Sequence, residues 1–119
     1  MERKMERADI AIIGTGPGGV SAALTAKVRN KNILLIGKKQ MSDKVSKAHQ
    51  IMNYPGLPAV TGADMAKAFE KQLAMMEIDI TDSRIGTVYA MGDYFAIQAG
   101  EEVLEAKSVI LACGVVSGK

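Results

Sequence analysis

The stretch DIAIIGTGPGGVSAALTA, residues Asp9 to Ala26, decides the fold because it joins an apolar run to a glycine-rich turn and a helical pattern. Asp9–Ile13 is short and rich in isoleucine, which is typical of a strand buried in a parallel sheet. From Gly18 to about Asn30, apolar residues recur at helical spacing. A second apolar run follows at Asn32–Ile36. Strand, helix and strand within about 30 residues predict a βαβ unit with a right-handed crossover.

The glycines between the first strand and the helix have the spacing of a dinucleotide-binding turn. Gly14, Gly16 and Gly19 form G-x-G-x-x-G. The first glycine allows a sharp turn, the second lets backbone approach a pyrophosphate, and the third lets helix and strand pack closely. The helix N-terminus adds free N–H groups and a partial positive charge. A purely structural glycine turn is the alternative, and the strand–turn–helix–strand context favours dinucleotide binding.

The end of the second strand lacks the acidic residue that usually binds a ribose hydroxyl. Gly37 stands there, followed by Lys38 and Lys39, and no carboxylate occurs before Asp43. One interpretation is that a lysine meets a phosphate or lies beside the adenosine. The other is that both are surface lysines in a solvated loop. This position alone does not choose between cofactors.

The middle of the chain begins with a turn-forming cluster, Asn53–Pro58, after a polar, lysine-rich stretch. Thr61 has the character of a helix N-cap. An apolar stripe then follows at spacings of four, four and three, which predicts a helix with one face in the core. The stripe consists of Met65, Phe69, Leu73 and Met76.

The last third of the chain reads as strands. Ile85–Met91 and Tyr94–Ala99 flank a Gly-Asp turn and predict an antiparallel pair. Val103–Ala106 predicts a third strand, and Ser108–Ala112 a separate buried strand. The expected fold is therefore α/β: a Rossmann-like parallel βαβ sheet with a small antiparallel β-meander at Ile85–Ala106.

Composition sets limits on the possible functions. A chain of 119 residues forms one domain at most. Its net charge of +2 gives no argument for binding nucleic acid or an anionic membrane. No apolar run approaches the roughly 18 residues of a membrane helix, and residues 1–7 lack the apolar core of a signal peptide. We therefore expect a cytoplasmic protein with no nucleic-acid or membrane partner.

Three segments resemble the N-terminal part of low-molecular-weight thioredoxin reductases, which belong to the pyridine nucleotide-disulfide oxidoreductases. They are DIAIIGTGPGGVSAALTAKVRNKNILLIG, MNYPGLP with the following TGADM, and SVILACGVV. The resemblance covers essentially the whole chain from Asp9. It implies an FAD cofactor bound by the glycine turn, by an Asn-aromatic-Pro-Gly segment, by an Ala-Thr-Gly strand end and by an adenine-side strand. The cofactor-binding residues that it implies are Gly14, Thr15, Gly16, Pro17, Gly18, Gly19, Asn53, Val88, Ala112 and Gly114. Gly37, Lys38 and Lys39 are added as candidates by their position at the end of the second strand, and a glycine at that position also occurs in the family.

The chain departs from this family in several places. Cys113 replaces the Thr of the strand end, and Ser42-Asp43-Lys44-Val45 stands where members usually have a Gly-Gly pair. The family's C-x-x-C, its nicotinamide-binding domain and its final flavin-binding segment are absent. Cys113 is the single cysteine, and its place at a buried strand end indicates an inert core thiol. The single histidine, His49, has no partner that suggests catalysis.

The resemblance predicts that residues 1–119 are the incomplete N-terminal segment of an FAD-binding domain, with no catalytic or metal-binding residue of its own. In a complete relative, electrons pass from a reduced nicotinamide, or in one branch from ferredoxin, through flavin to a disulfide and on to thioredoxin. This chain alone is not expected to reduce thioredoxin, because disulfide exchange needs a second thiol. The alternative is a non-enzymatic nucleotide-binding or structural fragment without flavin. A homodimer is a further possibility, because an incomplete sheet exposes an edge.

Overall fold

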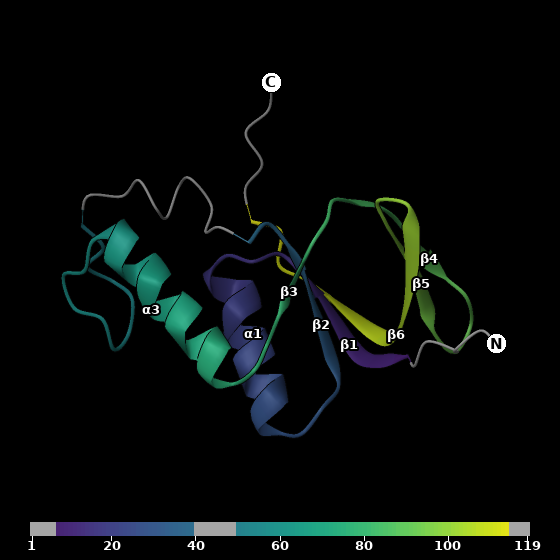
Figure 1. Ribbon diagram of the computed structural model, residues 1–119, viewed down its shortest axis with the longest axis horizontal. Coiled ribbons are helices and arrows are strands. Elements are labelled where there is room, and N and C mark those ends of the chain that lie inside the picture. The colour runs from purple at the N-terminus through teal and green to yellow at the C-terminus, as the bar shows by residue number, and fades with distance from the viewer. Residues whose placement is uncertain (1–6, 40–49, 115–119) are drawn as a thin grey trace.

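A computed structural model describes residues 7–39 and 50–114 of the chain (Figure 1). Its six strands form one sheet in the order β3-β2-β1-β6-β5-β4. The strands are β1 (Ala8–Ile13), β2 (Ile33–Gly37), β3 (Ile80–Asp82), β4 (Ile85–Ala90), β5 (Phe95–Ala99) and β6 (Glu102–Leu111), and the helices of the described residues are α1 (Pro17–Val28) and α3 (Gly62–Met75).

The βαβ unit expected from the opening stretch is present. β1 pairs in parallel with β2 on one side and with β6 on the other, and β3 pairs in parallel with β2. The helix α1 begins at Pro17, one residue before the expected start, and Asn30 beyond its end has a φ of 63°. The α/β class is confirmed. The carboxyl ends of four neighbouring parallel strands therefore share one edge, where such sheets bind ligands.

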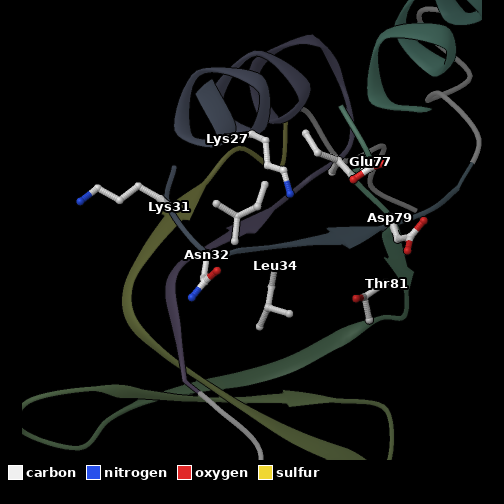
Figure 2. A pocket seen from close by; sticks show the side chains of 9 residues that line it. Lys27, Lys31, Asn32, Leu34, Glu77, Asp79 and Thr81 are labelled. Atoms are coloured by element: carbon white, nitrogen blue, oxygen red, sulfur yellow. The ribbon is translucent and has the colours of Figure 1, made fainter. Parts of the chain in front are cut away.

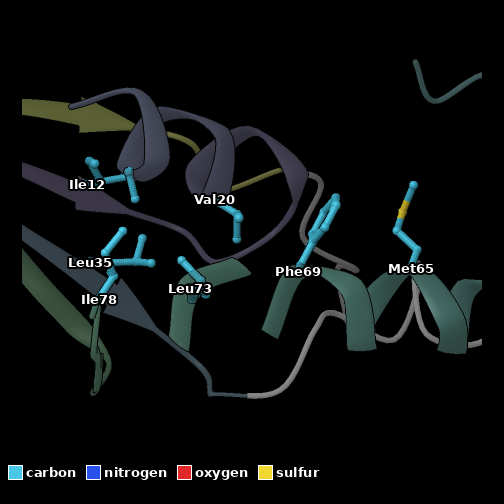
Figure 3. Close-up of a cluster of buried hydrophobic side chains, with 8 residues drawn as sticks. Ile12, Val20, Leu35, Met65, Phe69, Leu73 and Ile78 are labelled. Atoms are coloured by element: carbon cyan, nitrogen blue, oxygen red, sulfur yellow. The ribbon is translucent and has the colours of Figure 1, made fainter. Parts of the chain in front are cut away.

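Both helices lie on the same side of the parallel strands, and the first core cluster fills the space between them (Figure 1). Ile12 of β1 and Leu35 of β2 are almost fully buried against Val20 of α1. Phe69 and Leu73 of α3 point into the same cluster (Figure 3). The apolar stripe of α3 is therefore a core stripe, as its spacing predicts. Its N-cap is confirmed too, because the Thr61 hydroxyl accepts the Asp64 N–H at 3.1 Å.

The meander packs a second core cluster against the opposite face of the sheet. Ile97 of β5 and Leu104 of β6 lie with Ala11 of β1 and Ile36 of β2 in this cluster. Ala11 and Ile36 alternate along their strands with Ile12 and Leu35 of the first cluster, so their side chains lie on the face of the sheet opposite the helices. The helices therefore pack against one face of β1, and the apolar side chains of the meander pack against the other.

The sequence predicted two strands where the structure has one, and this prediction is wrong. Residues 102–111 form a single ten-residue strand, β6. Its first half pairs antiparallel with β5 and its second half pairs in parallel with β1. Ala106 takes part in both ladders. No glycine or proline interrupts the stretch, so nothing in the backbone ends the strand at Ala106.

None of the helices in residues 7–39 and 50–114 is long and apolar enough to cross a membrane.

Candidate nucleotide-binding site

The glycine turn lies between the carboxyl ends of the two strands that flank β1. The Gly14 N–H donates to the Ile36 carbonyl at 2.9 Å, which joins the turn to β2. The Ala112 N–H donates to the Ile13 carbonyl at 2.8 Å, which joins the end of β6 to β1. The Val20 N–H donates to the Gly16 carbonyl at 3.0 Å as helical bonding begins. The turn is therefore held on both sides by backbone hydrogen bonds.

The three motif glycines have different surroundings. Gly14 has a φ of +123°, and a Cβ on it would lie 2.0 Å from the Ala112 carbonyl oxygen. A Cβ on Gly19 would lie 1.8 Å from the Gly14 carbonyl oxygen. A Cβ on Gly16 would meet nothing within 4 Å. The first and third glycines are thus required for packing within the chain, and the second leaves open space beside the turn, as close approach of a pyrophosphate requires.

The N-terminus of α1 faces this open space without a side-chain cap. Gly16 is the N-cap residue, Pro17 occupies the first turn, and no acidic residue lies in that turn. The leading N–H groups and the positive end of the helix dipole are therefore available to an anion. The Ser, Thr, Asp or Asn that usually accepts a hydrogen bond from these N–H groups is replaced here by Gly16.

The glycine at the end of β2 is explained by its contact with the turn. A Cβ on Gly37 would lie 2.8 Å from Thr15 Cγ2 and 3.1 Å from Thr15 Oγ1. The Thr15 hydroxyl donates to the Lys38 carbonyl at 2.8 Å. The side chains of Lys38 and Lys39 are exposed. The structure thus brings the backbone of Lys38 to the turn, while both lysine side chains extend into solvent.

The end of β6 forms the other wall of the site. A Cβ on Gly18 would meet the Ala112 Cβ at 3.8 Å, and Gly114 has a φ of +69°. Cys113 lies beyond the last residue of β6 and is exposed, with its Sγ 3.8 Å from the Ile13 carbonyl oxygen. The expectation of a buried core thiol is therefore wrong. The apolar run that suggested burial ends its strand at Leu111, and the part of the chain that the structure describes leaves Cys113 uncovered.

Two of the expected residues lie apart from this cluster. Asn53 is exposed in a loop closed by an Ile51–Val60 bridge, on the outer side of α3 (Figure 1). The loop is attached through Tyr54, whose ring meets that of Phe69 edge-on at 5.4 Å. Val88 is in β4, at the edge of the sheet, half-buried in the second core cluster. The structure therefore assembles Gly14–Gly19, Gly37, Lys38, Ala112 and Gly114 at one edge, without contacts that add Asn53 or Val88.

A residue that the sequence pattern did not single out also reaches this edge. Asp82 ends β3 and pairs with Gly37 in the ladder. The sequence shows Asp82 as an acidic residue at the end of an alternating apolar pattern. That it lies beside Gly37 follows only from the pairing of β3 with β2. His49 and Ser42–Val45 lie outside the described residues.

A cleft of about 300 Å³ lies at the opposite end of the sheet (Figure 2). It is lined by residues at the amino ends of β2 and β3 and at the end of each helix, among them Lys27, Lys31, Glu77 and Asp79. Open α/β sheets bind ligands at the carboxyl ends of their strands. The cleft is therefore separate from the candidate site at the glycine turn.

The parallel sheet and the open glycine turn at its carboxyl edge define an α/β protein of the Rossmann-like type. The chain belongs to the pyridine nucleotide-disulphide oxidoreductase family, whose model matches residues 8–119. A thioredoxin reductase from Helicobacter pylori is 36% identical over 109 residues, which are 89% of this chain and 35% of that protein. One from Mycoplasma pneumoniae is 30% identical over 112 residues, 93% of this chain and 36% of that protein.

A solved structure of a ferredoxin-flavin thioredoxin reductase from Clostridium acetobutylicum has the same fold over 97% of this chain, with a TM-score of 0.92 and 44% identity. The chain covers 40% of that protein. The family resemblance expected from the sequence is thus confirmed, and the chain spans about a third to two fifths of the length of these relatives.

Proposed function

We propose that this chain binds FAD at the glycine turn and forms the FAD-binding portion of a thioredoxin reductase-like oxidoreductase. The observation that carries the proposal is the open space at Gly16, between an uncapped helix N-terminus and the ends of β2 and β6. Backbone N–H groups at the start of α1 would bind the pyrophosphate, while Gly14 and Gly19 hold the turn in shape. Bound FAD would supply the redox chemistry.

The choice of FAD rests on the family. Its relatives include a protein described as a ferredoxin-flavin thioredoxin reductase. The three sequence segments that resemble flavin-binding elements of this family support the same choice, because glycine spacing alone does not distinguish FAD from a nicotinamide dinucleotide. Asn53 and Val88 stay predicted contacts, and both need a flavin complex to test them.

The wider role is part of the same proposal. Residues 1–119 would be the N-terminal segment of an FAD-binding domain, and a complete protein would pass electrons from NAD(P)H or ferredoxin through FAD to a disulfide, with thioredoxin as partner. This chain has one cysteine, so it has no dithiol that could exchange with thioredoxin. We therefore expect no thioredoxin reduction by the chain alone. The cytoplasmic location stays a prediction from the sequence.

Titration with FAD tests the proposal, with visible absorbance and flavin fluorescence as readouts. Gly16→Ala places a methyl group in space that is open in the protein, so it should leave the fold intact and weaken FAD binding. An obstruction of about 1–3 kcal/mol corresponds to a loss of about 5- to 150-fold in affinity. Gly86→Ala in β4 is the matched control, because it lies outside the glycine turn and its Cβ would make only an ordinary contact with Gln98 Cγ at 3.9 Å. Equal affinity of Gly16→Ala and wild type, or no FAD binding by wild type, would contradict the proposal.

A second candidate is a non-enzymatic module that self-associates and holds no flavin. It is favoured by the free edge of β6: within the described chain, residues 107–111 pair only with β1, and Leu111 is 71% exposed. An unpaired apolar strand edge is a surface for pairing with a second copy. Light scattering after size exclusion would show a dimer, and the protein would stay colourless after incubation with FAD. A yellow monomer excludes this candidate.

A further inference from the structure

The ends of β2 and β3 lie side by side at the edge that carries the glycine turn. The ladder pairs Leu35 with Ile80 and, two residues further, Gly37 with Asp82. Leu35 and Ile80 both pack into the first core cluster, beneath the helices. Strand side chains alternate with a period of two, so Asp82 projects on the same side, next to a residue that has no side chain. Adjacent strands are about 4.8 Å apart, which is within the reach of an aspartate.

The usual position for a ribose-binding carboxylate is closed in this protein. Any side chain on residue 37 would meet Thr15 at 2.8 Å. Thr15 has little freedom to turn aside, because its hydroxyl is held by the Lys38 carbonyl at 2.8 Å. The Thr15–Gly37 contact therefore leaves no room for an acidic side chain at position 37 itself. In the part of the chain that the structure describes, the strand paired with β2 at this position, β3, ends in a carboxylate.

We propose that Asp82 supplies this carboxylate and accepts a hydrogen bond from the 2′-hydroxyl of the adenosine ribose, across the bare backbone of Gly37. This inference rests on the proposed binding of a dinucleotide at the glycine turn. Asp82 is exposed, and its carboxylate makes no ion pair or hydrogen bond with residues 7–39 or 50–114. A hydroxyl that donates to a carboxylate forms a charge-assisted bond, stronger than one to a neutral acceptor.

The exposed side chains of Lys38 and Lys39 lead to the opposite expectation. If they determine recognition of the ribose, the site should prefer a 2′-phosphate, as basic residues do in sites for phosphorylated dinucleotides. A carboxylate at Asp82 should instead disfavour a 2′-phosphate by charge repulsion and favour the free hydroxyl. The two mechanisms therefore predict opposite changes in affinity when a 2′-phosphate is added to the ligand: an increase if the lysines determine recognition, and a decrease if Asp82 does.

Calorimetric titration of the chain with ADP, 2′-deoxy-ADP and 2′-phospho-ADP separates them. Wild type should prefer ADP over 2′-deoxy-ADP by about tenfold, the effect of one hydrogen bond to a charged group. Asp82→Asn should lose most of this preference and bind 2′-phospho-ADP better than wild type does. Asp79→Asn is the matched control, because it removes a carboxylate from the cleft at the other end of the sheet and should change neither preference.

Urea unfolding confirms that each variant is folded before titration. Retention of the wild-type preference in Asp82→Asn, or a wild-type preference for 2′-phospho-ADP, would overturn the role of Asp82 while dinucleotide binding stands. If wild type binds neither FAD nor ADP, the proposed function is overturned, and this inference with it.

Discussion

Alanine substitutions at two successive glycines of the turn should have opposite effects on stability. A Cβ on Gly19 would lie 1.8 Å from the Gly14 carbonyl oxygen and 2.7 Å from its carbon. A Cβ on Gly18 would have the Ala112 Cβ as its nearest neighbour, at 3.8 Å. The obstruction at Gly19 is backbone, so no side-chain rotation relieves it. The contact at Gly18 is an ordinary van der Waals contact.

These contacts determine how far each substitution should change the free energy of unfolding. Overpacking typically costs about 1–3 kcal/mol, and Gly19→Ala should be near 3 kcal/mol because α1 must move away from the end of β1. That is a large share of the roughly 5–15 kcal/mol by which a domain is stable. Gly18→Ala removes a flexible residue from the first turn of a helix and should stabilise the chain by about 0.5 kcal/mol.

Urea unfolding followed by far-ultraviolet circular dichroism measures both effects, since the chain has no tryptophan to serve as a fluorescent probe. With a denaturant dependence of about 2 kcal/mol per M, the midpoint should fall by about 1.5 M for Gly19→Ala and rise by about 0.25 M for Gly18→Ala. A Gly19→Ala midpoint at or above that of wild type would refute the close packing of the turn against α1.

Three further substitutions test other parts of the fold by the same urea assay. Glu77 directly follows Met76, the C-cap residue of α3, and has a φ of 58°. Glu77→Gly should therefore stabilise the chain by about 1 kcal/mol, whereas the control Glu70→Gly on the exposed face of α3 should destabilise it by a similar amount. Thr61→Ala should cost about 1 kcal/mol, because it removes the N-cap of α3. The Asn32 N–H donates to the Asp9 carboxylate and lowers its pKa below the ordinary 3.8. The ionised carboxylate therefore contributes fully to the folding stability above pH 3.8, and this contribution is lost as the pH falls through the lower folded-state pKa. Asp9→Asn should therefore lose less stability than wild type between pH 5 and pH 3, and an identical loss would contradict the assignment.

The βαβ unit could be predicted because its signals are local. The apolar runs and the glycine spacing of Asp9–Ala26 each define an element without reference to distant residues. β6 could not be divided correctly from sequence, because its extent depends on two partners. Ala106 pairs with Phe95 on one side and Ala8 on the other, and this double pairing carries the strand across the place where a break was expected.

The candidate site shows the same division between local and distant information. The glycines of the turn were identified from their spacing, but the reason for Gly37 is a contact with Thr15, 22 positions earlier in the chain. The exposure of Cys113 likewise depends on which residues cover the end of β6, about which an apolar run says nothing. Asp82 became a candidate only through the pairing of β3 with β2.

The order of these elements along the chain has a consequence for how the site forms. β1, the turn, α1 and β2 lie within residues 8–37, but the wall at Ala112 arrives only with β6. A Cβ on Gly14 would collide with that wall and not with anything in the βαβ unit, since its nearest atoms belong to Ala112 and Cys113. Glycine at the first position of the motif is therefore required twice: locally by its φ of +123°, and by a segment about 98 residues away through the packing of β6 beside β1. The phosphate-binding turn is local in sequence, and its shape is fixed by the whole sheet.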